Sequence, residues 1–218
     1  MTKLRARHVV WDWNGTLLND NHAVLAAVNT VCAQYGRAAV TLDEWRAVFS
    51  RPILACYEKV LGQALTVADW DVIDRQYHTA YRLELDSCGL ATGVPDLLHQ
   101  WRDAGRTQSL LSMWFHDELV PLIGKLSLTD LFNRVDGLRG YNMGGSKAAH
   151  LVEHLKAQDL DPAEVILIGD VVDDAEAAAQ VGAQCVLVTT GMMPRSRLAT
   201  AGVPVTDSIP EALALIDA

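Results

Sequence analysis

Short apolar runs alternate with helical patterns along most of this 218-residue chain. The runs end at turn signals or charged residues and lack polar alternation, which is typical of strands buried on both faces. The predicted strands cover residues 8–11, 107–111, 164–168 and 184–188, with 204–205 as a weaker fifth candidate. Helical patterns cover residues 95–104, 118–126, 148–157 and 174–181. This alternation predicts an α/β fold with a doubly wound parallel sheet covered by helices on both faces.

Residues 19–89 differ from the rest of the chain, because helical periodicity dominates them and strand-like runs are missing. The helical patterns in this segment cover residues 22–35, 42–49, 53–61 and 68–85. The segment separates the first predicted strand from all the others. We therefore expect an α/β core domain of residues 1–18 and 90–218, and a helical cap domain of residues 19–89.

The composition excludes several classes of partner. A formal net charge of −9 disfavours nucleic acid and anionic membrane surfaces. No stretch approaches the ~18 consecutive apolar residues that a membrane-spanning helix needs, and the apolar run after the basic N-terminus is too short for a signal peptide.

The four cysteines are scattered without a CxxC pair, which indicates free thiols in a reducing cytoplasm. The sequence leaves the oligomeric state open.

Asp12 directly follows the first predicted strand, in the segment of residues 12–16 that reads DWNGT. In parallel sheets, ligands bind beyond the carboxyl ends of the strands. Gly15 lets the backbone curl around the carboxylate and point its N–H groups toward an anion. This arrangement suits an anionic nucleophile, although an Asn-Gly turn that merely ends a strand would give the same pattern.

Three carboxylates, Asp170, Asp173 and Asp174, lie within five residues after the third predicted strand. Carboxylates so close together repel one another, and a hard cation such as Mg²⁺ explains them better than packing does. Alternatively, Asp173 or Asp174 caps the helix that follows, where negative charge is favourable. We expect one of these two residues to cap the helix and the other to face the site.

Taken together, these segments resemble the haloacid dehalogenase (HAD) superfamily over essentially the whole chain. Residues 12–16 are similar to the family's first motif, Asp-x-Asp-x-Thr, and residues 169–174 to its fourth, Gly-Asp-x-x-x-Asp. Between them, Ser112 in Leu-Leu-Ser and Lys147 in Gly-Gly-Ser-Lys match the second and third motifs. The resemblance implies a Rossmann-like core with a helical cap inserted between the first two motifs.

The resemblance also implies a chemistry and a set of residues. The activity would be hydrolysis of a small phosphorylated metabolite through an aspartyl phosphate on Asp12. A Mg²⁺ cofactor would gather the phosphate oxygens, held by Asp12, the Asn14 carbonyl, Asp170 and Asp174, with Asp173 as the alternative to Asp174. The implied catalytic residues are Asp12, Asn14, Ser112 and Lys147. The implied phosphate-binding residues are Gly15, Thr16, Ser112, Met113 and Lys147.

Asn14 departs from the family pattern. Family phosphatases have an Asp at this position, which protonates the leaving group and later activates water. An amide does neither, and the loss of a general acid/base typically costs ~10²–10⁴ in rate. Three explanations stay open: a slow or differently assisted phosphatase, a different reaction, or an altered sequence. A protein that binds a phosphorylated ligand without turnover is a further alternative.

The different reaction would be C–P cleavage, because phosphonoacetaldehyde hydrolases of this family also lack that Asp. They use a cap lysine, whereas the cap here holds a single lysine, Lys59, at a poorly matching position. The third motif also lacks the Lys-Pro-x-Pro of many phosphoglycolate phosphatases, which leaves that substrate open. The candidate substrate contacts in the cap are Arg51, Tyr57, His22 and Arg82, each of which could equally be a helix-surface residue.

Overall fold

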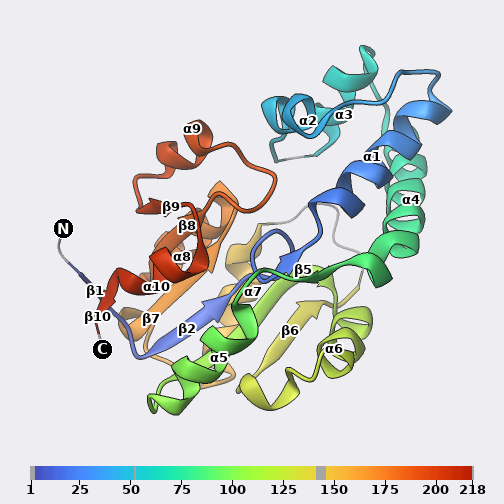
Figure 1. Cartoon of the computed structure of the whole chain (residues 1–218). Helices are drawn as coiled ribbons and strands as arrows, with labels where there is room; N and C mark the ends of the chain where they lie inside the picture. Colours follow the sequence, from blue (N-terminus) through green and yellow to red (C-terminus); the bar gives the residue numbers. More distant parts are fainter. Residues whose placement is uncertain (1–2, 52, 141–145, 218) are drawn as a thin grey trace.

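A computed structural model of the protein describes residues 3–51, 53–140 and 146–217. Within this part of the chain, six parallel strands form one sheet in the order β6-β5-β2-β7-β8-β9 (Figure 1). The strands are β2 (His8–Trp11), β5 (Thr107–Phe115), β6 (Val135–Leu138), β7 (Val165–Gly169), β8 (Gln184–Val188) and β9 (Val205–Thr206). The predicted parallel α/β sheet is thus confirmed.

Helices cover both faces of this sheet, as a doubly wound fold requires. One face packs against α5 (Val94–Asp103), α6 (His116–Lys125) and α10 (Ile209–Ala214), and the other against α7 (Lys147–Lys156) and α8 (Val172–Val181). Side chains alternate between the two apolar clusters along each strand. In β2, Val9 and Trp11 belong to the first cluster and Val10 to the second, so the strand is buried on both sides.

The sequence does not predict β6, and the predicted end of β5 is wrong. β6 reads Val-Asp-Gly-Leu and contains no apolar run that would mark it; its pairing with β5 makes it a strand. β5 was expected to end at residue 111, which would place Ser112 beyond the strand. Instead the strand continues to Phe115, which pairs with Leu138 after an irregularity in the register. Ser112 therefore lies inside β5.

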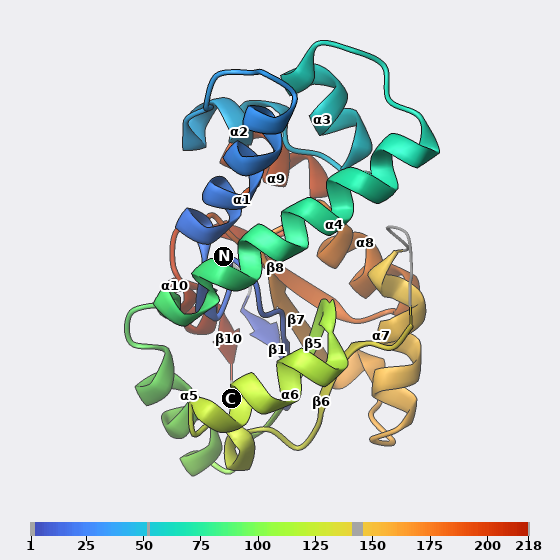
Figure 2. The same ribbon diagram turned by 90° about the vertical axis from the view of Figure 1, so that its right-hand side faces the viewer.

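The inserted segment forms α1 (Asn21–Gln34), α2 (Leu42–Val48), α3 (Leu54–Leu61) and α4 (Val67–Glu84). α1 and α4 lie side by side in both views, and α2 and α3 lie toward one end of them (Figures 1 and 2). The N-termini of α2 and α4 are capping boxes, in which Thr41 pairs with Glu44 and Thr66 with Asp69. Each pair satisfies two backbone N–H groups, which fixes where the helix begins.

The chain enters and leaves this helical segment at adjacent points. β3 (Leu18–Asn19) pairs antiparallel with β4 (Gly89–Leu90). We propose that the chain divides at this crossing into a core of residues 1–18 and 90–218 and a cap of residues 19–89. Further elements of the core include β1 (Leu4–Arg5), which pairs with β10 (Ile216–Asp217), and α9 (Arg195–Leu198).

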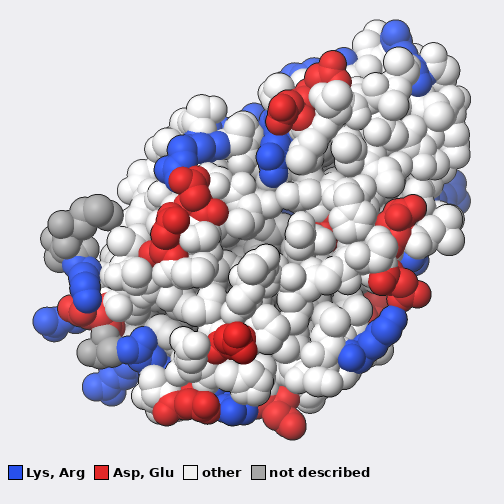
Figure 3. Space-filling view, viewed as in Figure 1, with Lys and Arg blue, Asp and Glu red and all other residues white. Residues whose placement is uncertain are grey.

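Exposed charges of both signs are interspersed on the face shown in Figure 3. Lys and Arg lie beside Asp and Glu, mostly around the rim. This face therefore offers no broad area of a single charge. Among the described residues, no helix combines the length and apolar character needed to cross a membrane.

His8 is a buried titratable group at the start of β2, 2% exposed. Its Nδ1 lies 2.8 Å from the Thr107 hydroxyl, and its Nε2 lies 2.7 Å from the Ser109 hydroxyl. Burial, and secondarily the neighbouring His154, lower the pKa of His8 from 6.5 to about 4. The folded protein therefore resists protonating this ring until the pH is well below the pKa of the unfolded chain.

This difference predicts a pH-dependent loss of stability. As the pH falls from about 6.5 toward 4, His8 becomes protonated in the unfolded chain but stays neutral in the folded protein. The free energy of unfolding therefore decreases across that window. His8→Gln removes the linkage. Between pH 7.5 and 5.0 we expect the free energy of unfolding to fall by roughly 2 kcal/mol less in this variant than in the wild type. Urea unfolding at both pH values measures it, with the exposed His99→Gln as control; an identical pH response in His8→Gln would contradict the assignment.

Candidate active site

Asp12 and Asp170 lie just beyond the ends of two neighbouring strands. β2 pairs with β7 through Trp11 and Ile168, and the Asp12 N–H donates to the Ile168 carbonyl at 2.9 Å. The parallel pairing brings both carboxylates to one edge of the sheet. Carboxylate oxygens of Asp12, Asp170 and Asp174 all lie within 4.8 Å of one another, and all three residues are buried. The strand-end carboxylates singled out from the sequence therefore meet.

Lys147 lies at the first position of α7 and reaches into this cluster. Its Nζ donates to Oδ1 of Asp12 and, at 2.5 Å, to Oδ1 of Asp174. The residue is 2% exposed. Burial alone would lower the pKa of the Lys147 amine, but the charges of Asp12 and Asp174 outweigh it and raise the pKa above its ordinary value. The amine therefore stays protonated.

One ammonium group does not balance three buried carboxylates. Burial raises the pKa of Asp12 to about 6, against the opposing effect of Lys147. Burial, followed by the charges of Asp12 and Asp174, raises the pKa of Asp170 well above its ordinary value. Oxygen ligands of this kind suit a hard divalent cation, whose charge would let all three groups ionise. The residues present therefore fit a Mg²⁺ ion.

Close backbone packing holds the Asp170 carboxylate in place. The Met192 N–H donates to its Oδ2 at 3.3 Å, and the Thr16 hydroxyl lies 3.5 Å from its Oδ1. Gly191 packs so closely that a Cβ there would overlap the carboxylate. Arg46, in α2 of the cap, donates from Nε and Nη2 to the Gly191 carbonyl at 3.2 and 2.7 Å. A side chain of the cap thus hydrogen-bonds to the loop that packs on Asp170.

Asp174, rather than Asp173, belongs to the carboxylate cluster. Besides its contact with Lys147, the Asp174 carboxylate accepts the Val171 N–H at 3.2 Å, so it also caps the start of α8. Asp173 accepts the backbone N–H of Lys147 at 3.2 Å and thereby caps α7. The two aspartates therefore link the N-termini of two helices that pack side by side.

The Asn14 side chain belongs to a buried network with Asp20, which the sequence reading overlooked. Asn14 Nδ2 donates to Asp20 Oδ2 at 2.9 Å and lies 2.8 Å from the Tyr81 hydroxyl. The Tyr81 hydroxyl itself donates to Asp20 Oδ2 at 2.7 Å, and the Gly15 N–H donates to Asp20 Oδ1 at 2.8 Å. Asp20 is 1% exposed, and burial raises its pKa. A carboxylate thus lies directly beside the amide that replaces the family's second Asp.

The other predicted phosphate-binding residues surround this cluster. Gly15, with φ +72°, and Met113 line the cavity described below, whereas Thr16 and Ser112 are buried and do not. The Ser112 hydroxyl accepts the Trp114 N–H at 3.0 Å and lies 3.5 Å from Asn14 Oδ1. Two glycines of the third motif, residues 144 and 145, lie outside the described residues. The phosphate-binding roles stay predictions.

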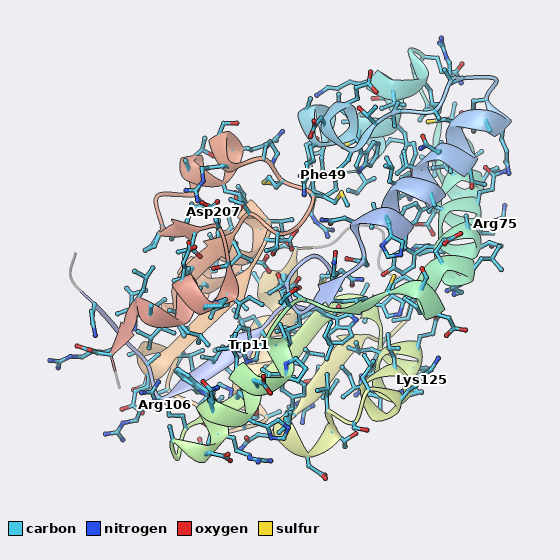
Figure 4. The ribbon with its side chains drawn as sticks, viewed as in Figure 1. Trp11, Phe49, Arg75, Arg106, Lys125 and Asp207 are labelled. Carbon is cyan, nitrogen blue, oxygen red and sulfur yellow. The ribbon has the colours of Figure 1, made fainter. Side chains whose placement is uncertain are left out.

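A cavity of about 260 Å³ lies between these groups and the cap helices. Its floor is formed by the polar groups Asp12, Asn14, Asp20, Lys147, Asp170, Asp173 and Asp174. Its walls carry the aromatic residues Trp45, Phe49, Tyr57, Trp70, Tyr77, Tyr81, Trp114 and Phe115. Figure 4 shows Phe49 on the side of α2 that faces the core. The catalytic candidates therefore face a largely apolar cavity.

Two of the four candidate cap contacts line this cavity. Arg51 and Tyr57 do, whereas His22 pairs with the Ser87 hydroxyl at 2.7 Å and Arg82 with Glu118 at 2.7 Å, outside the lining. Lys59 is exposed on α3 and is not part of the lining either. The cap lysine that C–P cleavage would need is therefore missing from the described walls.

Residues 9–188 match the family model of the haloacid dehalogenase-like hydrolases. The chain belongs to this family. Two curated relatives are the phosphoglycolate phosphatases of Synechococcus elongatus, 27% identical over 201 residues (88% of each chain), and of Agrobacterium fabrum, 24% identical over 186 residues (84% of this chain, 80% of the relative).

Solved structures of other hydrolases share the fold. A haloacid dehalogenase-like family hydrolase from Streptococcus pneumoniae superposes with a TM-score of 0.81 at 18% identity, over 98% of this chain and 99% of the other. A hydrolase from Pseudomonas syringae superposes with a TM-score of 0.75 at 16% identity, over 96% of each chain. The core and the inserted helices are therefore both present in these relatives.

The packing on Asp170 predicts a sensitive position in this HAD-like hydrolase. Gly191→Ala would push its methyl group against the Asp170 carboxylate and displace it. Because misplacing a reacting group by about 1 Å can cost ~10²-fold in rate, we expect at least a tenfold loss of hydrolytic activity without unfolding. Gly89→Ala, which meets nothing within 4 Å, is the control and should retain activity. Equal activity of the two variants would show that Asp170 tolerates displacement.

Proposed function

We propose that this hydrolase is a Mg²⁺-dependent phosphatase that acts on small phosphate monoesters and uses Asp12 as its nucleophile. The observation that carries this proposal is the hydrogen bond of Lys147 to Asp12, with two further carboxylates within 4.8 Å, at the floor of the cavity. A mere anion-binding site would not place carboxylates where an anion must enter. A bound cation and a nucleophilic Asp12 together account for the three carboxylates.

Mg²⁺ would be held by Asp12, Asp170, Asp174 and the backbone carbonyl of Asn14. When bound, it offsets the repulsion between the Asp12 carboxylate and the phosphate and stabilises the charge that develops in the transition state. Asp174 also anchors the Lys147 amine, and Asp173 holds the backbone of the same residue. These contacts keep the amine oriented toward the nucleophile before the substrate arrives.

The chain's own residues perform two chemical steps. A carboxylate oxygen of Asp12 forms a bond to phosphorus, and the bond from phosphorus to the alcohol oxygen breaks. The departing alcohol takes its proton from solvent or from a neighbouring group, because the Asn14 amide has no acidic proton to give. Water then forms a bond to the phosphorus of the aspartyl phosphate, the bond from phosphorus to Asp12 breaks, and inorganic phosphate leaves the regenerated carboxylate. Lys147, Gly15, Thr16, Ser112 and Met113 would bind the phosphate during these steps.

Two finer features belong to the same proposal. Phosphoglycolate is the first ester to test, since curated relatives carry the name phosphoglycolate phosphatase. A cytoplasmic location is supported by four free cysteines, of which Cys32, Cys56 and Cys185 are buried, because thiols stay reduced in that compartment. A protein that binds phosphate esters without turnover is the second candidate, and the replacement of an acid by Asn14 favours it.

The proposal predicts that activity depends on Mg²⁺ and on Asp12. Chelation with EDTA should abolish hydrolysis of a phosphate ester, and added Mg²⁺ should restore it. Asp12→Asn should lower kcat on the order of 10³-fold or more, because the variant cannot form the covalent intermediate. Asp96→Asn, an exposed carboxylate in α5, is the matched control and should keep full activity. Binding of the ester without turnover in the wild type would favour the second candidate instead.

Asn14 and Asp20 offer a direct test of the missing acid. Asn14→Asp alone would put a carboxylate at a position 2.9 Å from Asp20, where like charges repel and the pair must share a proton. Exchanging the two residues, as Asn14→Asp with Asp20→Asn, keeps one amide and one carboxylate and preserves their hydrogen bond. The exchange therefore supplies an acid at position 14 without the repulsion.

We expect the exchanged variant to hydrolyse alkyl phosphates up to ~10²-fold faster than the wild type, and the single Asn14→Asp variant to gain less. Aryl phosphates should gain least, because their leaving groups depart without protonation. The measurement is kcat on one alkyl and one aryl phosphate, with Asp20→Asn alone as control. If the exchange gains nothing on either ester, Asn14 does not stand in for a missing acid/base.

A further inference from the structure

The cavity above the catalytic groups concentrates the aromatic side chains of the protein. Eight of the chain's 14 Trp, Tyr and Phe residues line it, although the lining comprises 26 of 218 residues. The volume, about 260 Å³, is close to the lower end of the ~300–1,000 Å³ that ligand pockets span. The space therefore suits a phosphate group together with one ring system.

The aromatic residues form two clusters. In the first, the Tyr57 ring lies 5.3 Å from Trp45 and 6.4 Å from Trp70, between centroids, so three cap helices contribute to it. In the second, the Trp114 ring of β5 lies 5.0 Å from Tyr81 and 5.6 Å from the ring of His78, both in α4. Rings at such separations present the edges and faces that bind another ring.

Three buried polar groups of residues that line the cavity have no hydrogen-bond partner among the described residues. They are the indole N–H groups of Trp45 and Trp114 and the hydroxyl of Tyr57. These residues are 2%, 7% and 1% exposed, so the unpaired groups are hidden from bulk water. A buried polar group without a partner is costly. All three groups can donate, and a ligand whose acceptor atoms reached them would satisfy them.

We propose that the site takes phosphate monoesters whose leaving alcohol carries an aromatic heterocycle with acceptor atoms. This inference rests on the proposed phosphatase function and names the substrate class of the same site. The flat ring would pack between the aromatic walls, and its nitrogen or carbonyl acceptors would meet Trp45, Tyr57 or Trp114. The phosphate would lie at the carboxylate and Lys147 floor.

A short anionic leaving group such as glycolate fits these walls less well. It offers no apolar surface to the rings, and the wall contains the carboxylate of Asp74, which pairs with His78 at 3.3 Å. Arg51 is the cation of the cap wall, but it is exposed and so its attraction for a carboxylate is weakened by solvent.

The test compares kcat/KM for five esters with Mg²⁺ present. Two are heteroaromatic (pyridoxal 5′-phosphate and uridine 5′-monophosphate), one is benzyl phosphate, and two are aliphatic (phosphoglycolate and glycerol 3-phosphate). We expect the better heteroaromatic ester to exceed both aliphatic esters at least tenfold, about 1.4 kcal/mol, with benzyl phosphate between them. Preference for the pyridoxal ester indicates a ring joined through one carbon, and preference for the nucleotide a ring carried on a sugar. Equal or better turnover of an aliphatic ester overturns the inference.

Two tyrosine variants separate the unpaired hydroxyl from general effects on the enzyme. Tyr57→Phe removes one wall donor and should lower the ratio of kcat/KM for the heteroaromatic ester to that for benzyl phosphate by ~3–10-fold, as expected for one hydrogen bond. Tyr35→Phe, at the end of α1 and outside the lining, should leave the ratio unchanged. If neither Tyr57→Phe nor Trp45→Phe changes it, the unpaired donors do not read the ring.

Binding separates failure of this inference from failure of the proposed function. Quenching of tryptophan fluorescence in Asp12→Asn with Mg²⁺ reports ligand binding without turnover. If no ester is hydrolysed by the wild type but the heteroaromatic phosphates bind more tightly than phosphoglycolate, the phosphatase proposal fails and the ligand class stands. If all five esters are hydrolysed without preference and bind alike, the phosphatase stands and the inference fails.

Discussion

The contact of Lys147 with Asp12 and Asp174 is the interaction on which the site depends. Three buried carboxylates would repel one another strongly, and a buried charge is tolerated only when it is paired. The ammonium group supplies that pairing, and it also joins the end of β2 to the N-termini of α7 and α8. The same ion pairs therefore serve the packing of two helices and the position of Asp12, the proposed nucleophile.

The fold could be predicted where the signal is local. Strands such as residues 8–11 and 184–188 are apolar after their first residue, and the structure has β2 and β8 at those residues. β6 was missed because Asp136 and Gly137 break its apolar character, and the strand exists through its pairing with β5. Asp12 and Asp170 were recognised because each directly follows a strand, and the ends of parallel strands converge.

The network around Asn14 could not be predicted in the same way. Asp20 reaches back to Asn14 because the chain turns through Gly15 and forms β3 in between. Tyr81 approaches from α4, 61 residues further along the chain than Asp20. Similarly, no local signal separates the wall residue Tyr57 from the surface residue Arg82, since both lie on amphipathic cap helices. Only the packing of the cap on the core decides which helix faces line the cavity.

The two hydrogen bonds from Arg46 to the Gly191 carbonyl couple the cap mechanically to the loop beside Asp170. A cap that swings away from the core must either give up these two hydrogen bonds or drag the loop with it. In the second case the packing on Asp170 would change as the cavity opens. Release of the alcohol and relaxation of the carboxylate cluster would then be parts of one motion, so a stiffer hinge would slow both together.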